Sequence, residues 1–302
     1  MELKERFPGC LAGLAAGDAV GTAVEFSPRG SFPPLIEMTG GGPFGLEPGQ
    51  WTDDTSMALC LATSLVEMGG FDPTDQMDRY CRWLKEGYLS SNGRCFDIGN
   101  ATHASLQRYQ KTGNPYSGSS DPGSAGNGSI MRLAPIPMFF FQDLKALEFY
   151  AAESSRTTHA AVECIDACRL YSRITWRALK GMSKEETLLG DRDGFDAVPK
   201  ILGIARGEYI TKAESQIRGS GYVVESLEAA LWCFYHTTTF QEAILAAVNL
   251  GDDADTTAAV CGQVAGAFYG ETGIPARWME RLALREVICG LAEQMYLRVQ
   301  HV

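Results

Sequence analysis

Helical periodicity is the feature that most constrains the fold of this chain. Apolar residues recur three and four positions apart in six clear segments: 55–67, 73–86, 160–180, 224–236, 240–250 and 281–298. Runs with the apolar–polar alternation of strands are nearly absent. We therefore predict an all-α globule, and we find no internal repeat of roughly 20 to 50 residues that would indicate a solenoid.

Helix start signals support several of these segments. Asp72 followed by Pro73 offers an N-cap with proline at the first helical position. The stretches 183–186 (SKEE) and 239–242 (TFQE) fit the capping-box pattern. With 302 residues and 45% hydrophobic content the chain can bury a sizeable core, and we expect a single domain over residues 1–302.

Two long segments resist helix formation. Residues 26–50 and 113–128 are rich in glycine, proline, serine and asparagine. Loops longer than about 12–15 residues in a compact domain are usually functional or disordered, and neither segment has the charge run of a solvated tail. A domain linker is the alternative for 113–128, but the apolar helical patterns on both sides need a shared core.

The net charge and the length of the uncharged stretches limit the kinds of molecule that the chain can bind. Lysine and arginine total 26 against 37 acidic residues, a net charge of −11 that disfavours nucleic acids and anionic membranes. The longest stretch without a charged residue, 256–270, has 15 residues, fewer than the about 20 helical residues that span a bilayer. We expect no membrane segment, and an anionic ligand would need local cations.

The N-terminus and the cysteines point to the cytoplasm. The first ten residues lack the basic start and apolar run of a secretory signal. Nine cysteines are scattered through apolar segments with no CxxC pair, which is typical of reduced, buried thiols. Cys164 and Cys168 lie one helical turn apart, and core packing is favoured for both.

Two acidic clusters each stand immediately before an apolar, small-residue helix. The first is Asp53-Asp54, and the second is Asp253-Ala254-Asp255, preceded by Asp252. N-capping is the plain alternative, because a carboxylate at a helix start accepts free backbone N–H groups. A cap needs only one carboxylate, however, and crowded carboxylates beside buried segments are costly unless a cation compensates them.

The donor atoms of these clusters indicate which cations they would bind. Carboxylates and the neighbouring threonine hydroxyls are all oxygen ligands, which suit Mg²⁺, Mn²⁺ or Ca²⁺ and argue against zinc. Five acidic side chains from two ends of the chain are enough for two ions, the arrangement that activates water in hydrolases.

Several motifs, in order and spacing, resemble those of the ADP-ribosylglycohydrolase family. They are GLAAGDAVG at 13–21 with Glu25-Phe26, TDDT at 52–55, DIGN at 97–100, GNGSIMR at 126–132, Thr158-His159, and NLGDDADT at 249–256. One departure is visible, because family members often have a glycine where this chain has Asp252. The consequence for metal choice is left open.

The resemblance implies a compact all-α fold with a binuclear Mg²⁺ or Mn²⁺ centre at the base of a cleft. It implies six metal ligands: Thr52, Asp53, Asp54, Asp253, Asp255 and Thr256. Glu25 matches a family glutamate near the metals, and its alternative is an exposed carboxylate at a loop edge. The acids expected to take part in catalysis are Glu25, Asp53, Asp54 and Asp253.

The resemblance also implies substrate-binding residues: Asp97, Asn100, Gly126, Asn127, Gly128, Ser129, Met131, His159 and Tyr222. The 126–129 loop would offer backbone N–H groups to a diphosphate, with a following helix pointing its N-terminus at the phosphates. An ordinary Asn-Gly turn is the alternative there. For His159 the alternative is a structural histidine, for Asp97 an N-cap of a helix at 98–111, and for Tyr222 a core position.

The function implied is hydrolysis of the glycosidic bond that joins ADP-ribose to a protein side chain, with arginine linkage favoured. An oxocarbenium-like transition state would be stabilised by the carboxylates. Two alternatives remain open: a two-metal phosphoester or pyrophosphate hydrolase, and a non-catalytic ADP-ribose-binding protein. The sequence leaves the acceptor, the physiological target, regulation and the oligomeric state open.

Overall fold

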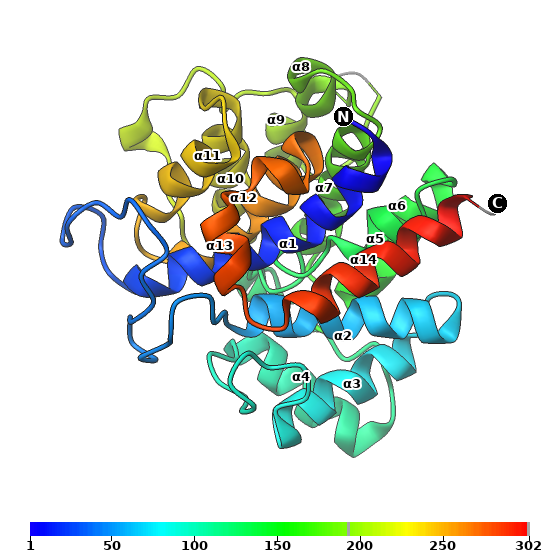
Figure 1. Ribbon diagram of the computed structural model, residues 1–302. Coiled ribbons are helices and arrows are strands. Elements are labelled where there is room, and N and C mark those ends of the chain that lie inside the picture. Colours follow the sequence, from blue (N-terminus) through cyan, green and yellow to red (C-terminus); the bar gives the residue numbers. More distant parts are fainter. Residues whose placement is uncertain (192–193, 301–302) are drawn as a thin grey trace.

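Helices α1 (Leu3–Gly21) and α12 (Ala254–Tyr269) come from opposite ends of the chain and pack side by side in the middle of the molecule (Figure 1). The computed structural model describes residues 1–191 and 194–300. Both helices are buried along nearly their whole length. The remaining helices surround this pair, so both ends of the chain contribute to one apolar core.

Small residues allow α1 and α12 to approach closely. Gly9, Gly13 and Gly17 recur every fourth residue on α1. A Cβ atom added at Gly13 would lie 2.3 Å from the carbonyl oxygen of Gly262 on α12, and one added at Gly9 would lie 2.4 Å from that of Gly266. Such distances are shorter than van der Waals contact allows, so the spacing of the two helices depends on these glycines.

Fourteen α-helices and no sheet occur in the described residues, which confirms the predicted all-α class. Besides α1 and α12, the α-helices are α2 (Asp53–Met68), α3 (Pro73–Glu86), α4 (Asn100–Thr112), α5 (Pro135–Phe139), α6 (Leu144–Arg156), α7 (Val162–Leu179), α8 (Lys184–Leu189), α9 (Pro199–Ala205), α10 (Val223–His236), α11 (Phe240–Val248), α13 (Ala276–Arg281) and α14 (Arg285–Gln300). Four short 3₁₀ helices are η1 (Thr22–Val24), η2 (Pro122–Ser124), η3 (Glu214–Gln216) and η4 (Glu271–Gly273).

The predicted helix starts are confirmed. The Asp72 side chain accepts hydrogen bonds from the backbone of the first turn of α3. Ser183 and Thr239 form capping boxes with Glu186 and Glu242 at the starts of α8 and α11. Local side-chain hydrogen bonds set these helix starts, which is why they can be found from sequence.

The helix predicted at 281–298 is wrong at its start. Helix α13 ends at Arg281, and α14 begins only at Arg285. Between them Leu284 has a positive φ of 51°, and the backbone N–H of Ala283 donates to the carbonyl of Gly49 at 2.9 Å. A tertiary contact with the 26–50 loop therefore interrupts a continuous apolar pattern.

The two predicted loops are anchored to the core. No α-helix occurs in 26–50 or 113–128, as expected. The Arg29 guanidinium donates to the carbonyl of Leu250 and to two carbonyls in the 214–217 segment. In the second loop, the backbone N–H groups of residues 117 and 118 donate to the C-terminal end of α6 and the residue after it.

One segment corrects the expectation drawn from uncharged stretches. By length and composition Leu3–Val24 is long and apolar enough to cross a membrane, and it is the one such helix in the described residues. Within the protein, however, 89% of the apolar 18-residue window in this segment is buried. Its apolar character is thus accounted for by its place in the core.

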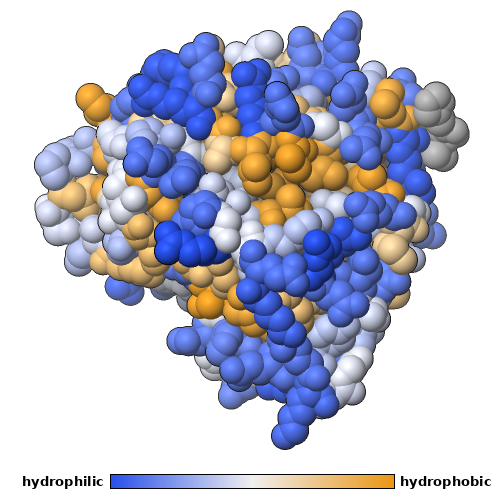
Figure 2. Space-filling view, turned by 60° about the horizontal axis from the view of Figure 1, so that its bottom comes forward, coloured by the Kyte–Doolittle hydropathy of each residue, from blue (hydrophilic) through white to orange (hydrophobic). Residues whose placement is uncertain are grey.

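The surface also carries apolar side chains. Exposed apolar side chains include Leu284, which precedes α14. Val287 and Leu297 within α14 are exposed as well. Figure 2 shows one face of the molecule, on which apolar residues gather in a band bordered by hydrophilic ones.

Candidate active site

The N-termini of α2 and α12 bring the two acidic clusters together. Asp53 and Asp54 lie inside the first turn of α2, and Asp255 lies inside that of α12. They therefore belong to the helices instead of preceding them. Neither Thr52 nor Asp253, the N-cap residues, makes a side-chain capping hydrogen bond, so simple N-capping does not account for these acids.

The cap of α2 comes instead from a different helix. Asp18 on α1 is fully buried. Its Oδ1 accepts from the backbone N–H of Thr52 at 2.8 Å, and its Oδ2 accepts from the backbone N–H and the hydroxyl of Thr55 at 3.0 and 2.6 Å. Because Asp18 satisfies the helix terminus, Asp53 and Asp54 are left for other partners.

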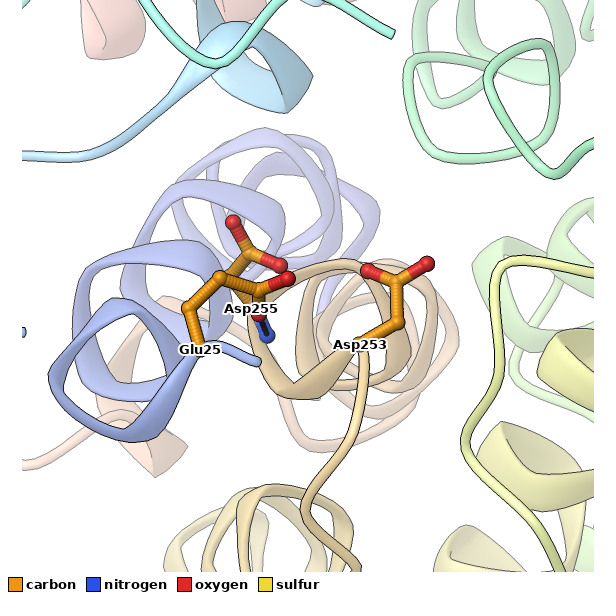
Figure 3. A group of neighbouring side chains, drawn as sticks. All are labelled: Glu25, Asp253 and Asp255. Atoms are coloured by element: carbon orange, nitrogen blue, oxygen red, sulfur yellow. Dashed lines mark hydrogen bonds between the residues drawn. The ribbon is translucent and has the colours of Figure 1, made fainter. Parts of the chain in front are cut away.

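Glu25 completes the carboxylate cluster from the end of the first helical segment. It is 4% exposed, so the alternative of a solvent-exposed loop-edge carboxylate is wrong. Its Oε2 accepts from the backbone N–H of Asp255 at 3.1 Å. One carboxylate oxygen from each of Glu25, Asp253 and Asp255 lies within 4.8 Å of the others, and Figure 3 shows these three side chains grouped together.

One side-chain oxygen of Asp54 is independent evidence that the cluster binds a cation. Its Oδ1 accepts from the Thr256 hydroxyl at 3.2 Å. Its Oδ2 is buried, and no hydrogen-bond donor for it occurs in the described part of the chain. A buried carboxylate oxygen without a donor is costly unless a cation neutralises it, so this donor set fits a hard metal ion.

Burial and mutual repulsion raise the pKa values of the acids. Burial, followed by the charge of Asp255, raises the pKa of both Asp18 and Asp253 to about 7. The same two causes raise the pKa of the other buried members, Glu25, Asp53 and Asp54. A bound divalent cation would relieve this repulsion and favour the ionised forms.

A cleft with a volume of about 470 Å³ opens onto this cluster. Predicted site residues that line it are Glu25, Asp53, Asp54, Asp97, Asn100, Gly126, Asn127, Gly128, Met131, His159, Asp253, Asp255 and Thr256. Three others do not line it. The Thr52 hydroxyl lies beneath, 3.0 Å from Asp255 Oδ2, and the Ser129 hydroxyl accepts from Ser155 at 3.0 Å; Tyr222 lines an adjoining hollow.

The 126–129 loop lies on the Asp253 side of the cluster. The side-chain amide of Asn127 donates to Asp253 Oδ2 at 2.7 Å. The backbone N–H groups of Gly126 and Asn127 are already bonded, to Ser124 and Gly221. The described residues supply no acceptor for the N–H groups of Gly128 and Ser129, and of these two Gly128 lines the cleft and is the donor left for an anion.

The helix expected to follow this loop is absent. Residues 128–132 form turns, and the next helix, α5, begins only at Pro135 and has five residues. Proline lacks the N–H that an earlier start would need inside the helix, which explains the delay. The predicted helix N-terminus at the phosphates is therefore wrong.

His159 packs directly on this loop. A Cβ atom at Gly128 would lie 2.7 Å from the histidine Cε1 atom, so glycine makes room for the ring. His159 Nδ1 lies 2.8 Å from the Thr158 hydroxyl. Burial, followed by the charge of Arg132, lowers the pKa of His159 to about 3, which keeps the ring neutral.

Arg132 was part of a motif in the sequence but had no assigned role. It is fully buried, and its guanidinium donates to the carbonyl of Gly128 at 3.0 Å and to the Thr158 hydroxyl at 2.7 Å. It thereby ties the glycine loop to the segment that carries His159. Asp18 was missed in the same way, although a lone aspartate inside an apolar glycine-rich helix is a visible signal.

Asp97 does not cap a helix and Tyr222 does not lie in the core, which were the structural alternatives for these two residues. Asp97 has a positive φ of 59°, and the N-cap of α4 is Gly99, so Asp97 is not a helix cap. Burial, followed by the charge of Asp53, raises the pKa of Asp97 to about 11. Tyr222 is half-buried, and its hydroxyl donates to Glu163 at 2.6 Å, which places it at a rim and not in the core.

Asp252 lies at a backbone junction. Its φ is 58°, a left-handed value that favours glycine. Its carbonyl accepts from the backbone N–H of Phe26 and its N–H donates to the carbonyl of Ser27, each at 2.8 Å. This pairing joins the acidic turn before α12 to the segment that carries Glu25.

Comparison with known proteins identifies the family of this chain. The family model for ADP-ribosylglycohydrolase matches residues 1–302. An ADP-ribosylarginine hydrolase, Tri1, from Pseudomonas putida (strain GB-1) is 46% identical over 298 residues, which cover 99% of this chain and 80% of the relative. The ADP-ribosyl-[dinitrogen reductase] glycohydrolase of Rhodospirillum rubrum is 32% identical, over 93% of this chain and 91% of that protein.

A solved structure described as an ADP-ribosylglycohydrolase-related protein complex has a TM-score of 0.88 and 44% sequence identity, and the match covers 98% of this chain and 99% of that chain. Fold and sequence therefore agree over nearly the whole length. The chain belongs to the ADP-ribosylglycohydrolase family.

Proposed function

We propose that this protein hydrolyses the bond between ADP-ribose and the guanidine nitrogen of an ADP-ribosylated arginine. The observation that carries the proposal is a single cleft in which the buried carboxylate cluster meets the Gly126–Gly128 loop and His159. A ribose at the carboxylates with a diphosphate at the loop would use both halves of this cleft. Two relatives at 46% and 44% identity are ADP-ribosylarginine hydrolases, which favours arginine as the acceptor.

We further propose that two divalent cations, Mg²⁺ or Mn²⁺, bind at the cluster. Glu25, Asp253 and Asp255 converge on one position, and Asp53, Asp54 and Thr256 line the same cleft. All of these are oxygen donors, the ligands that hard cations prefer. When bound, such ions polarise hydroxyl groups and water and neutralise the carboxylates.

The side chains of the chain itself would perform the remaining steps. The carboxylates stabilise positive charge at the anomeric carbon as the bond to the guanidine nitrogen breaks. A water molecule adds to that carbon, and its proton passes through Glu25, which lines the cleft, to the leaving guanidine. Gly128, which lines the cleft, donates its backbone N–H group to the diphosphate.

The test is hydrolysis of two substrates, ADP-ribosyl-agmatine with its guanidine linkage and a serine-linked ADP-ribosyl peptide, with Mg²⁺, Mn²⁺ or EDTA. We expect ADP-ribose from the guanidine-linked substrate and its loss with EDTA. AMP as the product would favour a pyrophosphate hydrolase instead. ADP-ribose binding without turnover of either substrate would indicate a non-catalytic binding protein.

A pair of substitutions links the cluster to activity. Asp253→Asn and Asp255→Asn remove ligand charge, so we expect calorimetric Mn²⁺ titration to show binding weakened about 10-fold or more, with turnover abolished. Asp143→Asn is the control, because Asp143 is an exposed N-cap of α6 and asparagine caps equally well. Normal ADP-ribose release by the Asp255→Asn variant contradicts the mechanism.

The cytoplasm remains the proposed location. All nine cysteines are free in the structure, and seven of them are buried. Thiols in this state suit a reducing compartment.

A further inference from the structure

Phe26 is an unusual residue at the mouth of the cleft. It follows Glu25 directly and lines the same cleft, yet its side chain is 65% exposed. Its φ of 62° is left-handed, a strained conformation for a bulky residue. The backbone pairing of Phe26 and Ser27 with Asp252 maintains this strain, so the fold holds an apolar ring in solvent beside an acidic cluster.

Two further rings extend this surface. Phe44, from the 26–50 loop, lies edge-on to Phe26 with 6.3 Å between ring centroids. Phe96, next to Asp97 in sequence, is 5.3 Å from Phe44 by the same measure. Phe26, Phe44 and Phe96 form what we call the aromatic wall, and of these three rings Phe26 is the one that lines the cleft.

Phe26 and the glycine loop adjoin different carboxylates of the cluster. Asn127 contacts Asp253, whereas Phe26 adjoins Glu25. Phe26 lines the same cleft as the glycine loop and the carboxylates. A ligand with its diphosphate at the loop and its ribose at the carboxylates leaves the part of the cleft at Phe26 for the group on its anomeric carbon.

From this arrangement we infer that the aromatic wall is the acceptor subsite, and that the arginyl guanidinium stacks on the ring of Phe26. The inference rests on the proposed function, because it assigns the other half of that substrate. A planar cation is attracted to the face of an aromatic ring, and Phe26 lines the cleft and is exposed.

A serine acceptor brings neither a cation nor a planar group to this surface. The subsite therefore predicts that Phe26 contributes to selection of guanidine-linked substrates and not to recognition of ADP-ribose itself. Binding of ADP-ribose, which lacks the acceptor, separates these two contributions.

The experiment compares Phe26→Leu and Phe26→Trp with the wild-type protein. Leucine keeps an apolar side chain but removes the π face, so we expect KM for ADP-ribosyl-agmatine to rise about three- to tenfold. Tryptophan, the strongest cation–π partner, should leave KM within about twofold of wild type. The Kd of ADP-ribose, measured by calorimetry, should be unchanged in both variants.

Agmatine itself provides a readout that does not require turnover. Its binding to the ADP-ribose-saturated protein should weaken in Phe26→Leu by a factor similar to the rise in KM. Ile36→Ala is the matched control, because Ile36 belongs to the same loop, is 76% exposed and does not line the cleft. We expect this variant to behave as wild type, and melting temperatures identify any variant that is misfolded.

The outcomes separate the two proposals. A wild-type protein that releases no ADP-ribose from ADP-ribosyl-agmatine overturns the proposed function, and the subsite with it. Wild-type turnover with an unchanged KM in Phe26→Leu overturns the subsite alone. A weaker Kd for ADP-ribose in Phe26→Leu also overturns it, because the ring would then contact the adenosine or the ribose.

Discussion

At the scale of single residues, the buried carboxylates divide into two kinds. Asp18 accepts hydrogen bonds from both the backbone and the hydroxyl groups of Thr52 and Thr55, so its oxygens are fully occupied by the protein. Asp54 leaves one buried oxygen without a donor in the described chain. Asp18 therefore has a structural role in the site, whereas Asp54 has an oxygen left for a bound cation.

Asp18→Asn tests this division. Asparagine replaces one acceptor oxygen by an NH₂ group, which leaves the backbone N–H of Thr52 or Thr55 facing another donor. We expect the free energy of unfolding with Mg²⁺ present to fall by about 1–3 kcal/mol, measured by urea denaturation. Asp72→Asn is the control at the start of α3, since asparagine is as good an N-cap as aspartate. Equal stability of the two variants would show that Asp18 does not hold α2.

At the scale of elements, the contact between α1 and α12 determines where the acids lie. Gly21 ends α1 against α12, and a Cβ atom there would lie 2.4 Å from the Cα atom of Asp255. At the other end of the pair, a Cβ atom at Gly9 would meet the carbonyl oxygen of Gly266 at the same distance. The two glycines therefore make equally close contacts, but only Gly21 adjoins the carboxylates.

This symmetry gives a matched pair of variants. Gly9→Ala and Gly21→Ala should each lower the free energy of unfolding by about 1–3 kcal/mol, because both overpack the helix contact. Only Gly21→Ala should weaken Mn²⁺ binding, measured by calorimetry, because it displaces Asp255. Gly290→Ala on α14 meets no atom within 4 Å and should increase stability by about 0.5–1 kcal/mol. Equal loss of Mn²⁺ affinity in the first two variants would contradict local positioning.

At the scale of the whole molecule, the carboxylate cluster makes stability depend on pH and on metal. The pKa of Asp18 and of Asp253 is raised to about 7 by burial and by the charge of Asp255. Between the ordinary aspartate value of 3.8 and about 7, the folded state therefore holds protons that the unfolded state has released. Stability must fall as pH rises through that window.

Thermal unfolding in EDTA should accordingly give a lower Tm at about pH 8 than at about pH 5.5. Mg²⁺ or Mn²⁺ should raise Tm more at the higher pH, because protons compete with the cation for the same carboxylates. An Asp53→Asn/Asp253→Asn double variant should lose most of this dependence on metal. A metal-induced rise in Tm that is identical at both pH values would contradict the assignment of the cluster.

The amino-acid sequence by itself determined the all-α class, the capped helix starts at Asp72, Ser183 and Thr239, and the two long loops. These features are encoded locally, in the period of apolar residues and in side chains that bond to their own turn. The oxygen-donor character of the acidic clusters was visible for the same reason. The family resemblance supplied the list of site residues, most of which line one cleft.

Only the tertiary structure decided how these residues work together. Glu25 bonds to the backbone of Asp255, 230 positions away, and Asp18 caps a helix that begins 35 residues later. The hydrogen bond from Asn127 to Gly221 and the exposure of Phe26 depend likewise on distant segments. A local pattern cannot specify such contacts, because they form only when helices from opposite ends of the chain pack together.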